Sequence, residues 1–360
     1  MAEPLTVGCD CIGLGSALIA LRQLSIPFTL VFASEIDTLC RDTLLSHASP
    51  QQFWHDIYSR ADNEAPHVDL YITGFPCQAF STMGNCEGFR APAHVGPCIF
   101  FKCVAYIQSG MPKIFILENV KGLMTIQSGR CFRAVLEKLF SLKGYHICWR
   151  VLNTREHGVP QNRKRLFFVG VRVDCYTGQF SFPRCLPKCA LDDFLDIRLG
   201  RPSWAQLPRP STSVVYQNVV FLLKQLESQG HDPFAEPWVF PCDSSPSRSH
   251  AMLDCSPCLM RSRPRGHWLS HHGRRMSFIE IWRLQGFCPD TIPMRPALQL
   301  ARQLGNSMSG NVLERLLCNV LPAAGLGREL FLVDRFAIRA AASVLQRPLS
   351  VAPSSDEEEL

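Results

Sequence analysis

The sequence predicts an α/β protein built around a buried, largely parallel sheet. Over residues 5–175, short apolar runs alternate with segments long enough to form helices. Runs of about four to eight apolar residues are typical of strands covered on both faces, and helical spacers between them indicate βαβ units. The runs are LTVGCD, FTLVFAS, VDLYIT, KIFILEN, YHICWRVL and RLFFVGV, and the spacers include SALIALRQL and RCFRAVLEKLF.

Composition divides the chain into four segments. The α/β pattern fills residues 1–175, whereas proline, serine, arginine and cysteine become frequent in residues 176–275, where we expect a second, smaller and irregular domain. Helical patterning returns in residues 276–345, in SFIEIWRLQGF and SMSGNVLERLLCNVL, and this segment is expected to return to the first domain. Residues 346–360 are predicted to be a disordered acidic tail.

The bulk composition fits a globular protein with free thiols. The 360 residues are 46% hydrophobic, and no basic segment followed by an apolar one opens the chain, so neither secretion nor membrane insertion is expected. The 17 cysteines are odd in number and scattered, which favours an intracellular, reducing compartment. If the host is eukaryotic, the expected compartment is the nucleus. The formal charge of +6 includes an acidic end, SSDEEEL, and the basic remainder is compatible with a polyanionic partner.

Residues directly after the apolar runs are the first candidates for a ligand site, because open α/β sheets bind ligands beyond the carboxyl ends of their strands. Gly13 and Gly15 precede a predicted helix, so the backbone could approach an anionic ligand closely; an ordinary tight turn would look the same. Glu35 follows the second run, where an acidic side chain commonly accepts hydrogen bonds from a ribose. Asp56 precedes the third predicted strand and could bind an adenine amino group, although its spacing alone favours a solvated loop carboxylate.

Cys77 follows a strand that ends in Gly-Phe-Pro. Proline fixes φ and removes a donor, so the next side chain should be held at the carboxyl edge of the sheet. Most cysteines are small buried hydrophobes, but a thiol in this loop is a credible nucleophile if nearby cations or a helix N-terminus lower its pKa.

Glu118 ends the next apolar run, in KIFILENVKGL. A carboxyl group buried there must be hydrogen-bonded, protonated or turned toward a ligand cleft, because an unpaired buried charge is costly. Asn119 beside it could hold the turn. A thiol and an acid at neighbouring strand ends could flank one small planar substrate.

Arg163 and Arg165 lie two residues apart in QNRKR, at the start of a predicted strand. Their side chains should therefore point to one face while Lys164 points to the other. Two guanidinium groups could fix a phosphate, lower the pKa of the thiol or pair with a substrate carbonyl; alternatively they are solvated residues that protect a strand edge.

The motifs, taken in order, resemble those of the cytosine-5 DNA methyltransferase family over residues 5 to about 320. Any one of them is weak alone, but PCQ, ENV and QNRKR in this order and spacing form a specific combination. The matching strings are GLGS, SEID, HDI, GFPCQAFS, ENVKG, QNRKR, RLQGF and GNSMSGNV.

The resemblance implies a Rossmann-like, S-adenosylmethionine-dependent DNA (cytosine-5-)-methyltransferase with a small target-recognition domain. The Cys77 thiolate would add to C6 of a flipped cytosine while Glu118 hydrogen-bonds its N3 edge. C5 would then attack the methyl group of the cofactor, and loss of the C5 proton with elimination of Cys77 would release 5-methylcytosine. Arg163 and Arg165 would support the catalytic loop and the base.

The resemblance also implies where the cofactor and substrates bind. The small domain would bind DNA through residues 241–283, which contain seven arginines, and the enzyme is expected to be a monomer. No metal is expected, because the C-x-x-C pair of Cys255 and Cys258, even with Cys242 and His250, lacks a second clear ligand pair. S-adenosyl-L-methionine would lie against Gly13, Gly15, Glu35, Asp56 and Asn306, and the substrate against Gln78, Ser81 and Asn119.

Three positions depart from the family pattern, and two rival functions remain. Cys11 replaces a usual aromatic residue and Ser16 a usual glycine, which predicts weaker cofactor binding, while Ala79 replaces a common proline and should loosen the catalytic loop. One rival is a tRNA cytosine-5 methyltransferase, against which the absence of a CFT segment argues. The other is a catalytically weak nucleic-acid-binding regulator, which would not need a thiol and a carboxylate in one pocket.

Overall fold

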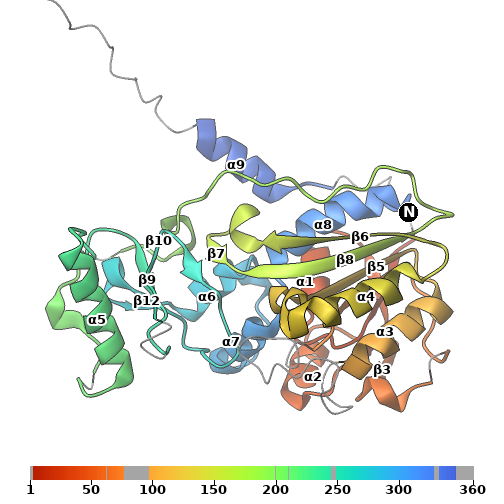
Figure 1. The fold of residues 1–360 in the computed structure, drawn as a ribbon, viewed down its shortest axis with the longest axis horizontal. Coiled ribbons are helices and arrows are strands. Elements are labelled where there is room, and N and C mark those ends of the chain that lie inside the picture. Colours follow the sequence, from red (N-terminus) through yellow and green to blue (C-terminus); the bar gives the residue numbers. More distant parts are fainter. Residues whose placement is uncertain are drawn as a thin grey trace, which may run out of the picture.

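The computed structural model describes residues 3–61, 63–76, 97–198, 200–209, 211–244, 249–327 and 332–345. A large α/β body and a smaller body at one side of it make up the molecule (Figure 1). The predicted site residues Cys77, Gln78 and Ser81, the Ala79 position and the predicted acidic tail lie outside the described residues.

A seven-stranded sheet forms the centre of the large body. Its first five strands are parallel, whereas β8 runs antiparallel to both of its neighbours. The prediction of an α/β fold with a largely parallel sheet is confirmed. Strand order reverses between β1 and β4, which is where such sheets bind ligands. In spatial order the strands are β3 (Gln52–Trp54), β2 (Phe28–Ser34), β1 (Leu5–Cys9), β4 (Leu70–Gly74), β5 (Ile114–Val120), β8 (Lys164–Arg172) and β6 (Tyr145–Asn153).

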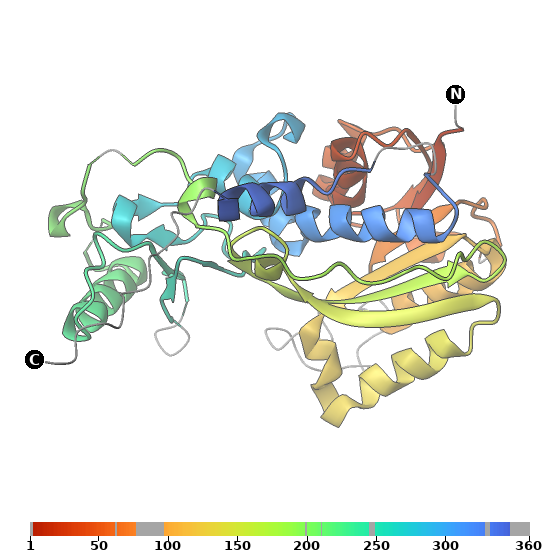
Figure 2. The same cartoon turned by 90° about the horizontal axis from the view of Figure 1, so that it is seen from above.

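Helices cover both faces of this sheet. α1 (Ser16–Gln23) and α8 (Gly310–Ala323) share one apolar core with the sheet, and α3 (Pro97–Gly110) and α4 (Arg130–Phe140) share the other. Seen from above, α8 in blue and α4 in yellow lie on opposite sides of the strands (Figure 2). In α4 the buried residues recur every four positions, so one stripe of the helix faces the core, as its sequence predicted.

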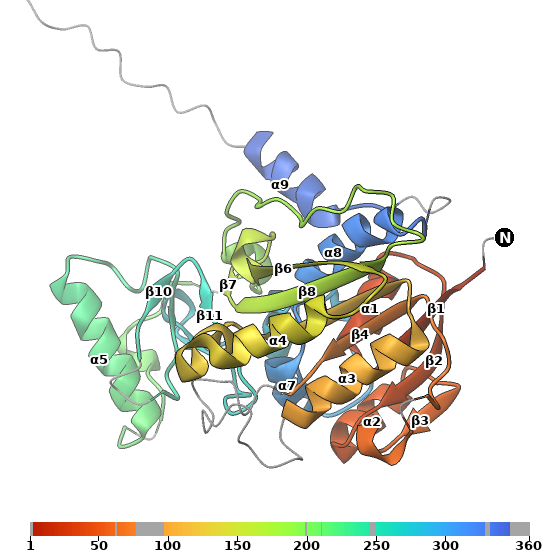
Figure 3. The same ribbon diagram turned by 45° about the vertical axis from the view of Figure 1, so that its right-hand side comes forward.

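The smaller body consists of one long helix, α5 (Val214–Ser228), and a four-stranded sheet, and both lie beyond the end of the main sheet (Figure 3). The prediction of an irregular domain missed this helix, because proline- and serine-rich segments on both sides of it dominate the local composition. The apolar side of α5 packs on the small sheet through residues such as Leu222 and Phe240. In spatial order the strands are β10 (Met252–Leu253), β9 (Trp238–Phe240), β12 (Trp268–Leu269) and β13 (Arg274–Arg275).

The C-terminal part of the chain returns to the large body. α6 (Phe278–Leu284) and α8 lie where helices were predicted, and Gly286, with φ of 88°, follows the end of α6. α7 (Ala297–Asn306) leads into α8, and α9 (Arg335–Leu345) follows it. None of the helices in the described ranges is long and apolar enough to cross a membrane.

Three short elements complete the description. α2 (Thr38–Leu45) begins at Asp37, whose carboxylate accepts hydrogen bonds from the first-turn amides. β7 (Gln161–Asn162) pairs in parallel with β11 (Ser256–Pro257), and this pairing joins the end of the main sheet to the smaller body.

Candidate active site

The carboxyl ends of β4 and β5 lie side by side, and Glu118 is at this edge of the sheet. Gly74, the last residue of β4, pairs directly with Glu118 on β5. A Cβ atom at Gly74 would lie 3.3 Å from Oε2 of Glu118 and 3.5 Å from Cε of Met308. Glycine therefore leaves room for the carboxyl group at the position three residues before Cys77 in the chain.

Asn119 anchors the loop that leads to Cys77. Its Nδ2 donates to the carbonyl oxygen of Phe75 at 3.1 Å, and its Oδ1 accepts from the amide of Val120 at 2.8 Å. Asn119 and Phe75 are both buried, so this contact fixes the chain where it leaves β4. The predicted turn-holding role of Asn119 fits these bonds; its substrate contact stays a prediction.

Glu118 is a buried carboxyl group with one guanidinium partner. Its side chain is about one-tenth exposed, and Nε of Arg165 lies 3.1 Å from its Oε1. Burial raises the pKa of Glu118, while Arg165 and Arg163 act in the opposite direction. A carboxyl group with a raised pKa keeps its proton to higher pH, so Glu118 is suited to donate a hydrogen bond to a ligand.

Arg163 is fully buried and clamps two distant segments to the sheet. Its guanidinium donates to the carbonyl oxygens of Leu259 at 3.0 Å, Gly305 at 3.2 Å and Ser307 at 2.6 Å, and to Sγ of Cys258 at 3.3 Å. Burial lowers the pKa of Arg163, although a guanidinium stays protonated in proteins. All these bonds go to the protein itself, so Arg163 positions the site, whereas Arg165 touches the carboxyl group.

Two buried glutamines extend this clamp, and the sequence analysis missed both. Gln161 bonds the carbonyl oxygen of Leu284 at 2.7 Å and accepts from the amide of Leu259 at 3.2 Å. It also bonds Gln285 at 3.1 Å, which in turn donates to the carbonyl oxygen of Ser307 at 3.1 Å. Their position in QNRKR and RLQGF was the only indication that the sequence offered.

The first glycine turn has the geometry expected of a cradle for an anionic or polar ligand. Gly13 has φ of 59°, and a Cβ atom there would meet nothing within 4 Å. Gly15, with φ of 84°, precedes α1, and no side chain caps the amides of that helix. The turn therefore leaves open space beside amide groups at a helix N-terminus.

Glu35 lies against this turn. Its carboxylate accepts from the amide of Gly13 at 2.7 Å and from the amide of Asp37 at 2.9 Å. Burial raises its pKa, and the two amide bonds oppose that effect. Ile36 beside it is 71% exposed.

The other two predicted cofactor residues, Asp56 and Asn306, lie on other elements than the glycine turn. Asp56 precedes the strand predicted as the third, which is β4, but it also follows a shorter strand, β3, that was not recognised in the sequence. Its carboxylate accepts from the amide of Tyr58 at 3.0 Å and begins a single helical turn, Ile57–Ser59. Asn306 is exposed at the end of α7.

A buried ion pair lies beside the glycine turn. Asp10 is fully buried and accepts two hydrogen bonds from Arg60, at 2.8 and 2.7 Å, and one each from Ser34 and Tyr71. Cys11 follows it with φ of 49°, a conformation that few residues other than glycine adopt readily. Four donors satisfy the carboxylate, so this network stabilises the chain directly before the glycine turn.

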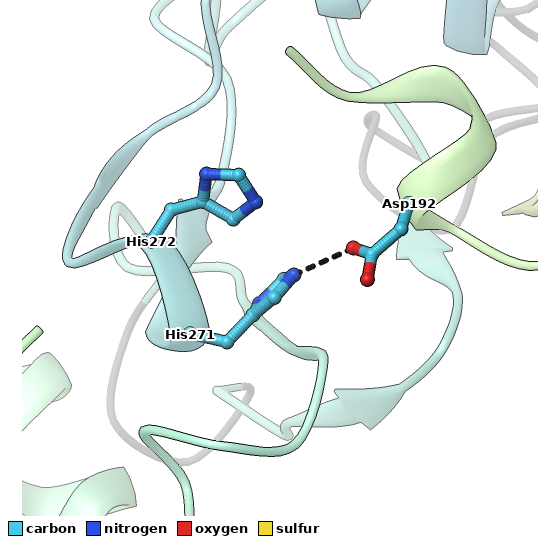
Figure 4. A group of neighbouring side chains, drawn as sticks. All are labelled: Asp192, His271 and His272. Atoms are coloured by element: carbon cyan, nitrogen blue, oxygen red, sulfur yellow. Dashed lines mark hydrogen bonds and ion pairs between the residues drawn. The ribbon is translucent and has the colours of Figure 1, made fainter. Parts of the chain in front are cut away.

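Two groups of side chains carry residue types that bind metals. Within the described ranges, only Asp192, His271 and His272 place three potential ligand atoms within 4.8 Å of one another, and the cysteines around the C-x-x-C pair form no such group. Figure 4 shows His271 hydrogen-bonded to Asp192, at 2.8 Å, with the His272 ring beside it. Arg274 donates to Nδ1 of His272 at 3.2 Å, so its positive charge opposes a bound cation.

Many arginines of residues 241–283 are paired with carboxylates. Arg274 pairs with Glu280 and Arg275 with Asp243, each within 2.7 Å. Two further arginines pair with carboxylates outside the segment, which its composition could not predict. Arg283 pairs with Asp196, and Arg261 pairs with Asp37. Fewer than the seven arginines counted in the sequence are thus available for phosphate contacts.

Comparison with known proteins gives consistent results. The family model described as C-5 cytosine-specific DNA methylase matches residues 10–194. The type II methyltransferase M.NgoBI of Neisseria gonorrhoeae is 32% identical over 311 residues, covering 81% of this chain and 87% of that protein. M.BsuFI of Bacillus subtilis is 38% identical over 157 residues, but this match covers 44% of this chain and only 37% of that protein. Among solved structures, the S. pombe Dnmt2 methyltransferase matches with a TM-score of 0.58 at 16% identity, covering 88% of this chain and 98% of that one, which shows a shared fold.

Proposed function

The chain belongs to the C-5 cytosine-specific DNA methylase family, and we propose that it methylates C5 of cytosine in DNA through a covalent adduct on Cys77. The observation that carries this proposal is the buried, guanidinium-paired Glu118 beside Gly74, at the strand end that leads to Cys77. A thiol and a carboxyl group at that edge could act on opposite sides of one planar base.

Glu118 would act as a hydrogen-bond donor to the base. N3 of cytosine is an acceptor, so a carboxyl group facing it must carry a proton, and burial of Glu118 raises its pKa in that direction. When the Cys77 thiolate adds to C6, electron density moves toward N3, and the donor stabilises that charge. Arg165, 3.1 Å from the other oxygen, orients the carboxyl group.

The remaining steps restore the base. S-adenosylmethionine, when bound, supplies an electrophilic methyl group. C5 of the Cys77 adduct would attack that group, and the methyl–sulfur bond would break with its electron pair kept by the departing S-adenosylhomocysteine. A base would then remove the proton from C5, and the C6–S bond formed in the first step would break as Cys77 leaves as a thiolate.

The glycine turn and its neighbours fit the cofactor. The open space at Gly13 and the uncapped amides of α1 would hold the methionine part of S-adenosylmethionine, and Glu35 would accept from its ribose hydroxyls. The exposed side chain of Ile36 offers an apolar surface for the adenine ring. The predicted cofactor contacts of Asp56 and Asn306 remain proposals.

DNA is the proposed partner, with tRNA as the rival substrate. A base stacked in a duplex cannot be reached, so the target cytosine must be extruded toward Glu118. Arg265, exposed in the smaller body, would contact phosphates. The likeness to Dnmt2 concerns the fold and does not choose between the two nucleic acids.

The test is transfer of labelled methyl groups from S-adenosylmethionine to duplex DNA and to tRNA, measured in parallel. We expect incorporation into DNA by the wild type and by Cys185→Ala, an exposed control cysteine, and none by Cys77→Ala. Incorporation into RNA alone would favour the rival enzyme. Cofactor binding without transfer to either nucleic acid would favour the regulator.

A further inference from the structure

Cys258 lies between the two arginines of the active site. Its Sγ is 3.3 Å from Nη1 of Arg163 and 3.9 Å from Nη2 of Arg165. Arg165 also holds Glu118, at 3.1 Å from Nε to Oε1. One guanidinium thus connects the sulfur of Cys258 to the carboxyl group that faces the base.

The charges around this sulfur favour a thiolate. The buried guanidinium of Arg163 and the partly exposed guanidinium of Arg165 both lie within 4 Å of this sulfur, and a thiolate would offset part of their positive charge. Burial would raise the pKa of Cys258, but Arg163 and Arg165 outweigh it and lower the pKa. A neutral thiol could donate only weakly to the carbonyl oxygen of Leu259 at 3.4 Å, and that oxygen already accepts from Arg163 at 3.0 Å.

Among the described residues, the other titratable groups near this sulfur do not change that balance. Glu118 approaches from β5, and Arg163 and Arg165 approach from the start of β8. His267, in the same segment as Cys258, bonds the backbone of Pro257 and Cys258, and burial lowers its pKa to about 4. His267 is therefore neutral near pH 7, and the two arginines dominate the field at the sulfur.

We propose that Cys258 is a positioning residue of the methyl-transfer reaction, which draws the charge of Arg165 toward its sulfur so that Glu118 keeps the proton that it donates to the base. The inference rests on the proposed function. Without a negative sulfur, more of the positive charge of Arg165 would act on Glu118, and the carboxyl group would lose its proton at lower pH. As pH rises, activity should then be lost at a lower pH than in the wild type.

Two substitutions of Cys258 by residues of the same shape separate the effect of its charge from the effect of its shape. Cys258→Asp keeps a negative charge between the arginines, whereas Cys258→Asn has the same shape without it. Cys258→Ser, close to the native size, keeps a hydrogen-bond acceptor but no charge. Cys255→Ser is the matched control, because Cys255 is a neighbouring buried cysteine whose pKa is raised to about 11 and which is therefore neutral.

The experiment is the pH profile of kcat for methyl transfer to duplex DNA. We expect the alkaline limb of Cys258→Asn and Cys258→Ser to move about one pH unit below that of the wild type. Cys258→Asp and Cys255→Ser should keep the wild-type limb. The inference would be overturned if the alkaline limbs of the wild type and Cys258→Ser lay at the same pH, or if those of Cys258→Asp and Cys258→Asn did. If the wild type transfers no methyl group to DNA, the proposed function fails instead, so the two failures are distinct.

Discussion

Replacing Arg165 with methionine tests the assignment of the buried pair without any substrate. The change removes the guanidinium 3.1 Å from Glu118 and keeps most of the side-chain volume. A buried pair that loses one partner generally costs about 3–5 kcal/mol of the free energy of unfolding, because a charge is left uncompensated. Glu118 can avoid most of that cost by taking up a proton, so the cost must depend on pH.

The direction of the pH dependence follows from the difference in the pKa of Glu118 between the folded and unfolded states. Burial raises the pKa of Glu118 in the folded protein, and Arg165 limits that rise. Without Arg165 the pKa rises further, so the unfolded chain loses its proton first, near pH 4.3, and stability falls as pH increases toward the new folded value. Each additional unit of pKa costs about 1.4 kcal/mol once the pH exceeds it.

The assay is urea denaturation of wild type and Arg165→Met at pH 5 and at pH 8. We expect a loss of about 1–2 kcal/mol at pH 5, from the lost contacts, and of about 3–5 kcal/mol at pH 8. Arg172→Met, on the same strand, is the control: its partner Asp174 is exposed and has a lowered pKa, so its effect should not change over this range. A loss for Arg165→Met that is equal at both pH values would refute the reasoning.

Three further predictions follow from other contacts. Gly74→Ala places a Cβ atom 3.3 Å from Oε2 of Glu118, so kcat should fall about tenfold. The midpoint of thermal unfolding should stay near the wild-type value. An unchanged kcat would mean that Glu118 has more room than the structure shows. Asp10→Asn leaves Arg60 buried without a charged partner, so urea denaturation should show a loss of about 3–5 kcal/mol, and a loss below about 1 kcal/mol would contradict a buried pair. Four arginines of residues 241–283 are paired with carboxylates, so the logarithm of DNA affinity should fall against the logarithm of salt concentration with a slope shallower than about −6, the value for seven phosphate contacts. A steeper slope would mean that the pairs open on DNA.

The main sheet and its ligand edge could be predicted because their physics is local. Buried strands read as short apolar runs, and residues after those runs, such as Gly13, Glu35 and Glu118, must lie at one edge of a parallel sheet. β3 was missed because three residues give no periodicity. The antiparallel direction of β8 depends on which strands it joins, and that is a tertiary property.

The internal bonding of the site could not be predicted. Cys258 lies 93 residues from Arg165 in the chain, and nothing in either local sequence shows that they meet. Asp10 appeared as an ordinary residue after an apolar run, yet its partner is Arg60, fifty positions later. The arginines of the smaller body were overestimated as phosphate ligands for the same reason, since Asp37 and Asp196 approach from other segments.

The most direct test of the central claim is to trap the adduct on Cys77. Duplex DNA that carries 5-fluorocytosine should react with the enzyme and S-adenosylmethionine, and the fluorine cannot leave as the C5 proton does, so the adduct should persist. We predict a denaturation-resistant protein–DNA complex whose cross-linked peptide contains Cys77, and none with Cys77→Ala. A cross-link that persists in Cys77→Ala, or one mapped to another cysteine, would contradict the account.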